Sequence, residues 1–163
     1  MDLAHDLLEG TGRGRLERVA VARLRVGVDL LEGIKDLARK EGIRTGVILS
    51  GVGALKKAVF RNLKVMPPDY KVDDRHRLYL ELEQPMEMVS LAGWIATGED
   101  GQTEIHAHFS ASTVIEDNVI TLGGHLSPGV ITSIKVVVVI GVIEDSPIRA
   151  AIDPTTNQVD IIF

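Results

Sequence analysis

Apolar and polar side chains alternate in the first clearly patterned stretch of the chain. Over residues 16–25, Val19 and Val21 fall on one parity and Leu24 on the other. Period-two alternation is typical of a half-buried β-strand. The pattern therefore predicts that residues 16–25 form the first strand, preceded by a glycine-containing lead-in.

The spacing then changes to that of a helix. Between residues 29 and 41, apolar residues recur every three or four positions and form a single stripe. Asp29 is placed to cap the free N–H groups of the first turn, with Glu32 completing a capping box. Gly42 suits the left-handed turn that ends a helix. Residues 29–41 are predicted to be the one prominent helix of the chain.

After Gly42 the period is two for the rest of the sequence. Strands are predicted over Ile43–Leu49, Ala58–Val65, Leu78–Leu82, Met86–Thr97, Thr103–Ser112, Val119–Leu122, Ile131–Ile143 and Val159–Phe163. Met66–Arg75, rich in Pro and Asp, predicts a loop, and Glu99–Gly101 predicts a hairpin turn. One helix and many strands in series predict an α+β fold with a mostly antiparallel sheet. A single helix leaves part of that sheet uncovered, which favours self-association.

Length and composition set further limits. With 163 residues the chain is expected to hold a flexible N-terminal lead-in over residues 1–15 and a single domain over residues 16–163. The chain has no cysteine, so any metal must be held by nitrogen and oxygen ligands. The acidic N-terminus is unlike a signal peptide, and the longest apolar run is too short to span a bilayer. These features predict a cytoplasmic protein with no membrane partner.

The charge distribution bears on nucleic-acid binding. The net charge is −5, which opposes general binding to phosphate, although the first half of the sequence is basic and the second acidic. Lys56, Lys57, Arg61 and Lys64 are the candidate DNA-binding residues, because Lys57 and Arg61 share a face of an alternating strand. The alternative is a solvated edge protected by lysine. Residues 13–15, Arg-Gly-Arg, match the centre of a minor-groove hook but lack its flanking prolines.

The strongest chemical signal is a set of three histidines. On a strand His106 and His108 project to the same side, with Glu104 next in the row. His125 follows the pair Gly123–Gly124 on what is predicted to be the neighbouring strand. Three imidazoles leave one coordination position of zinc or another divalent metal open, which is the catalytic pattern. Glu104 is then the candidate general base. The alternative is a polar edge or a hydrogen-bonded core pair.

Three other features receive structural interpretations. Ser50–Ala54 is rich in glycine but is not followed by a helix, so it is interpreted as a bend or bulge and not as a phosphate-binding loop. His76, between two arginines, is predicted to lie on the surface. Trp94, the only tryptophan, is predicted to lie in the core.

Several blocks of the sequence together resemble a known family. Ala22–Ile43, Val47–Leu55, Glu87–Ala96, His106–His108 and Gly123–Leu126 are similar, in this order, to segments of the plants and prokaryotes conserved (PPC) domain. The resemblance spans roughly residues 18–143. It implies a homotrimer built on an antiparallel sheet with one prominent helix. It also implies that the three matching histidines can hold a metal, zinc first among the choices, near a subunit interface.

Members of this family are also associated with DNA binding. Plant relatives join this domain to AT-hook motifs, and prokaryotic relatives often carry a DNA-binding label. Three functions remain for this chain. The first is a metal-binding homotrimer that senses a small molecule near the metal or acts on it by Lewis-acid or hydrolytic chemistry. The second is a DNA-associated regulatory or assembly protein, and the third is an inert trimeric scaffold.

Overall fold

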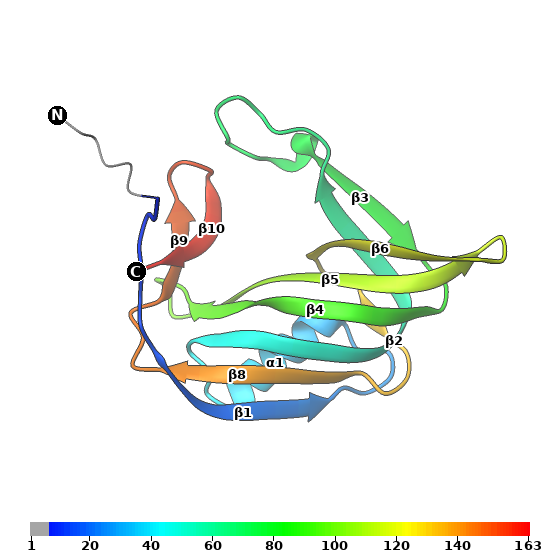
Figure 1. The fold of residues 1–163 in the computed structure, drawn as a ribbon, viewed down its shortest axis with the longest axis horizontal. Helices are drawn as coiled ribbons and strands as arrows, with labels where there is room; N and C mark the ends of the chain where they lie inside the picture. The colour runs from blue at the N-terminus through cyan, green and yellow to red at the C-terminus, as the bar shows by residue number, and fades with distance from the viewer. Residues whose placement is uncertain (1–6) are drawn as a thin grey trace.

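The computed structural model describes residues 7–163, in which one curved sheet is the main feature (Figure 1). Its strands are β1 (Arg15–Arg23), β2 (Gly46–Leu63), β3 (Arg77–Leu82), β4 (Met86–Thr97), β5 (Thr103–Ile115), β6 (Asn118–Leu126), β7 (Ile131–Thr132) and β8 (Val137–Glu144). Their order is β1-β8-β2-β4-β5-β6, and β3 and β7 also pair with β2. All these ladders are antiparallel. The predicted fold class is confirmed.

The helix α1 (Leu30–Lys40) is held by its predicted cap. Asp29 Oδ1 accepts hydrogen bonds from the backbone N–H groups of Leu31 at 3.0 Å and Glu32 at 3.2 Å. Its Oδ2 accepts from Gly129 N at 2.6 Å, so the same carboxylate also fixes a distant loop. Glu32 instead pairs with Lys35 Nζ at 3.0 Å, so the predicted capping box does not form. Gly42 has φ +63° and ends the helix as predicted.

The apolar stripe of α1 packs against the concave side of the sheet. Leu30 and Ile34 are fully buried and belong to one core with Ile48, Leu55 and Ile140 from the strands. Figure 1 shows the helix lying behind β2, β4 and β8. The convex side therefore carries no helix among residues 7–163.

The long strand β2 differs from the prediction of two separate strands. It continues through the glycine-rich segment, with register shifts between Ile48 and Ser50 and between Leu55 and Lys57. The interpretation of Ser50–Ala54 as a bulge or bend is therefore confirmed. Gly53 has φ +147°, and a Cβ there would lie 2.5 Å from Val136 Cα. The bend lets the first half of β2 pair with β4 and β8, and the second half with β3 and β6.

Other strands differ from the strands predicted from the sequence in their length or were not predicted at all. β6 extends to Leu126, joined to β5 by a two-residue turn at Glu116 and Asp117, whose φ angles are +46° and +61°. The predicted strand Ile131–Ile143 is interrupted between β7 and β8. The strand β9 (Arg149–Asp153) was not predicted, and it pairs with β10 (Gln158–Ile162) in a separate hairpin.

Two local predictions concern the ends of the chain and His76. The predicted lead-in is described only from residue 7, and residues 7–14 contain no helix or strand, while residues 1–6 lie outside the described part. His76 is half-buried instead of lying free on the surface. Its Nδ1 accepts a hydrogen bond from Asp73 N at 3.1 Å and caps the short 3₁₀ helix η1 (Asp74–His76). Within residues 7–163 no helix has the length and hydrophobicity to cross a membrane.

Candidate metal centre

The register of four strands builds a row of polar side chains across the sheet. Arg61 on β2 lies directly opposite Tyr79 on β3 and His125 on β6. His125 lies in turn opposite His108 on β5. Residues directly opposite one another in a ladder point to the same face. Tyr79, Arg61, His125 and His108 therefore form one continuous row.

His106 joins this row from two positions earlier on β5. The ligand nitrogens of His106, His108 and His125 all lie within 4.8 Å of one another. His106 Nε2 and His108 Nε2 are 3.3 Å apart. His125 meets both rings edge-on, with centroid separations of 4.8 and 5.2 Å. The structure thus brings together the three residues that the sequence singled out as metal ligands.

The spacing suits a divalent metal. Zn–N bonds of 2.0–2.1 Å in a tetrahedral site place two ligand nitrogens about 3.3 Å apart, which is the separation of the His106 and His108 nitrogens. The donor set is purely nitrogen, which zinc and related ions accept.

The electrostatics keep the imidazoles neutral, which is the form that binds metal. Burial lowers the pKa of His125 to about 3, helped by the positive charge of Arg61. Burial also lowers the pKa of His106, with His108 contributing next. The pKa of His108 falls for the same reason, again with Arg61 as the second cause. Three neutral imidazoles therefore face one another at neutral pH.

The triad lies in the wall of a cavity of about 650 Å³. Glu104 lines the same cavity, as its place in the row with His106 and His108 predicted. The prediction that Trp94 lies in the core is wrong, because Trp94 is only half-buried. Its ring lines the cavity, and the centroid of the ring is 5.4 Å from that of His106. Gln158 and Val159, from the hairpin β9–β10, complete one side. Sequence reasoning missed this contribution because Gln158 and Val159 lie far along the chain from the histidines.

The four candidate DNA-binding residues do not share one free surface. Arg61 turns into the histidine cavity. Lys57 is paired with Glu81, its Nζ 2.7 Å from Oε1. Lys56 and Lys64 remain exposed. The segment predicted as a basic patch thus divides between a site residue, an ion pair and two solvated lysines.

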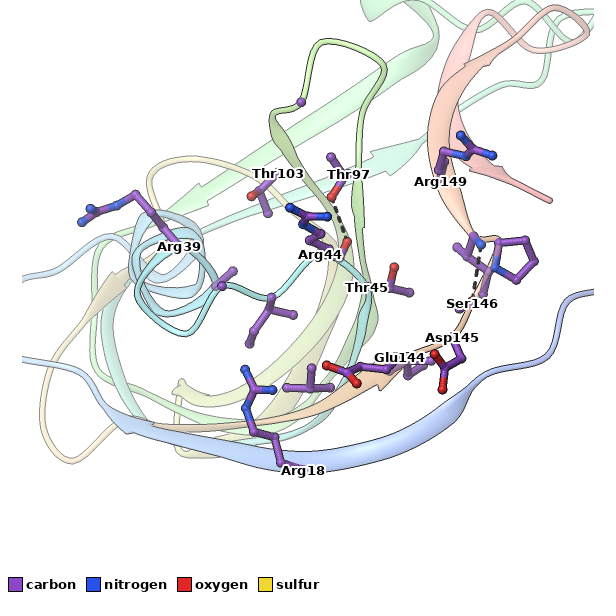
Figure 2. A pocket seen from close by; sticks show the side chains of 18 residues that line it. Arg18, Arg39, Arg44, Thr45, Thr97, Thr103, Glu144, Asp145, Ser146 and Arg149 are labelled. Carbon is purple, nitrogen blue, oxygen red and sulfur yellow. Dashed lines mark hydrogen bonds between the residues drawn. The ribbon is translucent and has the colours of Figure 1, made fainter.

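A second, larger cavity of about 960 Å³ lies at the C-terminal end of α1 (Figure 2). Figure 2 shows four arginines from separate elements around it: Arg18, Arg39, Arg44 and Arg149. Glu144 and Asp145 also line it, and both pair with Arg15, at 3.3 and 3.5 Å. Arg15 is the last residue of the Arg-Gly-Arg segment that matches only the centre of a minor-groove hook. Within residues 7–163 no histidine lines this cavity, whereas three histidines lie together at the first one.

Comparison with known proteins identifies the family. The model of the Plants and Prokaryotes Conserved (PCC) domain matches residues 11–144. The chain belongs to this family. The resemblance seen in the sequence, under the alternative abbreviation PPC, is therefore confirmed.

Solved structures share the fold. A metal-containing protein from Archaeoglobus fulgidus has a TM-score of 0.74 at 21% identity, with coverage of 94% of this chain and 99% of that one. A PPC protein from Pyrococcus horikoshii has a TM-score of 0.70 at 26% identity, covering 92% and 95%. A candidate DNA-binding protein from Bacteroides thetaiotaomicron has a TM-score of 0.70 at 17% identity, covering 94% and 99%.

Curated relatives are much longer proteins. The bifunctional protein GlmU of one Synechococcus strain is 32% identical over 112 residues, and that of a second strain is 28% identical over 139 residues. These matches cover 69% and 85% of this chain but only 15% and 19% of the relatives. The chain thus spans less than a fifth of the curated proteins that it matches.

The lowered histidine pKa values predict how stability depends on pH. A pKa that is lower in the folded state means that the unfolded chain binds protons more tightly. The contribution of neutral His125 to the stability of the metal-free protein is therefore present above pH 6.5 and is lost as the pH drops toward about 3, its folded pKa. Urea denaturation between about pH 7.5 and about pH 5 measures this loss. His125→Gln should flatten the dependence, and equal slopes for the two proteins would contradict the prediction.

Proposed function

We propose that this protein binds one divalent metal, zinc first among the choices, through His106, His108 and His125. The convergence of three neutral imidazoles on the wall of a cavity is the observation that carries the proposal. With three protein ligands, a tetrahedral ion keeps a position for a small molecule. A metal held there supplies Lewis acidity or an activated water.

The residues of the chain would divide the remaining tasks. Trp94 and Ile105 line the cavity beside the histidines and shield part of it from water. Glu104 is the carboxylate on the same strand as two of the ligands, so it is the proposed proton acceptor for a bound molecule. The protein would sense such a molecule or act on it.

We also propose that the chain assembles as a homotrimer, as the family resemblance implies. The convex face of the sheet supports self-association. The side chains of Leu16 and Leu49 each come within about 3.3 Å of the position of a Cβ built on Gly141, so they lie next to each other. Both residues are at least half exposed. Val21 and Val52, on the same sheet, are more than 60% exposed. Exposed apolar patches of this kind mark interfaces.

A second candidate function is association with duplex DNA. The name of the Bacteroides thetaiotaomicron neighbour supports it. Arg44 and Arg149 around the second cavity offer guanidinium groups for phosphate (Figure 2). The net charge of −5 acts against it.

Elemental analysis of protein purified without a histidine tag tests the metal proposal. We expect about one zinc or other divalent ion per chain, lost in the His106→Ala/His108→Ala double variant because one imidazole cannot hold the ion alone. His76→Ala, a histidine outside the triad, should keep the metal. An absence of metal in the wild type after loading with zinc would contradict the proposal and leave the inert scaffold.

Sedimentation velocity tests the assembly. Val21→Glu combined with Leu49→Glu places charge on the convex face and should shift a trimer to monomers. Val26→Glu changes an equally exposed valine in the turn after β1 and should leave the trimer intact. A wild type that sediments as a monomer would rule out the homotrimer.

Fluorescence anisotropy with a labelled duplex tests DNA association. Binding should weaken steeply as salt rises, because phosphate contacts release counterions. Arg44→Gln/Arg149→Gln should weaken it further, whereas Arg61→Gln should not. Unchanged anisotropy at low salt would remove this candidate function.

A further inference from the structure

Arg61 is a half-buried cation that no carboxylate contacts directly, although Asp74 acts on its charge from beyond Tyr79. Within residues 7–163, no carboxylate oxygen forms an ion pair with its guanidinium, which is hydrogen-bonded to Tyr79. Its neighbour Arg77 is occupied, since it donates to Asp74 Oδ1 at 3.1 Å and to Gln158. Arg61 is thus the cation in this cavity that remains available to a ligand.

Arg61 lies beside the histidines, so a ligand that binds its guanidinium would also lie next to the metal site. It lies opposite His125 in the ladder, and its charge acts on all three imidazoles. A divalent ion on the triad would bring further positive charge to the same wall of the cavity. Partly buried charges of one sign repel each other unless an anion lies between them. The single Glu104 carboxylate in the cavity offsets only part of this positive charge, so the site favours a negatively charged ligand.

The other residues that line the cavity indicate the chemistry of the rest of that ligand. Leu63, Val72, Trp94, Ile105 and Val159 give the cavity an apolar lining. At about 650 Å³ the cavity is far larger than a single inorganic ion needs. One guanidinium also matches a carboxylate, which it can bind through two parallel hydrogen bonds.

We propose that the cavity binds a small organic carboxylate, with its acid group between the triad-bound metal and Arg61 and its apolar part against Trp94. The proposal rests on the proposed metal site. It assigns Arg61 to ligand recognition and not to DNA, and it defines the class of molecule that the protein senses or acts on.

Binding of benzoate to the zinc-loaded protein tests the proposal. Trp94 is the only tryptophan, so its fluorescence reports occupancy of this cavity, and calorimetry supplies an independent readout. Benzamide has the same shape without the charge and should bind at least about tenfold more weakly. Acetate and inorganic phosphate should also bind more weakly than benzoate, because neither contacts the apolar walls.

Matched variants locate the acid group. Arg61→Gln should weaken benzoate binding by at least about tenfold, while its zinc content stays equal to the wild type. Lys64→Gln removes an exposed lysine outside the cavity and should change neither quantity.

The outcomes separate the two proposals. A wild type that holds no zinc overturns the metal site itself. If zinc binds, the carboxylate proposal is overturned by any of three results: no saturable benzoate binding, equal binding of benzoate and benzamide, or full benzoate affinity in Arg61→Gln. Tighter binding of phosphate than of benzoate would overturn the organic class of ligand.

Discussion

The pairing of β2 with β6 is the constraint on which the site depends. The bend in β2 carries its second half to β6, where Phe60 pairs with Leu126 and Arg61 with His125. Phe60 and Leu126 face the core, and Phe60 stacks on Phe109 with ring centroids 5.0 Å apart. Their chain neighbours Arg61 and His125 must then face the other side of the sheet. A slip of one residue would turn His125 inward and break the row, so core packing fixes the register of the site.

Close approach of these two strands depends on the glycines before His125. A Cβ on Gly124 would stand 2.9 Å from the Arg61 carbonyl oxygen, so only glycine fits without a shift. Asn62 Nδ2 donates to the Gly123 carbonyl at 2.8 Å and holds the strands together at this point. The two glycines thus serve the position of His125 and not its chemistry.

The fold and the chemistry of the cavity place different demands on the chain. Membership of the family accounts for the sheet and the helix, whereas function depends on which side chains line the cavity. Here neutral imidazoles, the guanidinium of Arg61 and an indole ring meet at one wall, with Glu104 nearby. The hairpin β9–β10 lies beyond the part matched by the family model and still supplies Gln158 and Val159 to the cavity.

The sequence by itself determined the features that depend on neighbours along the chain. It predicted α1 with its Asp29 cap, the strand Met86–Thr97 and the common face of His106 and His108, because helical and strand periods are local. Only the tertiary structure decided that Arg61 faces the histidines and that Trp94 lines their cavity, and it placed His125, which the sequence had already named, against the other two. Strand neighbours and register are set by hydrogen bonds and core packing between residues far apart in sequence, which no local pattern records.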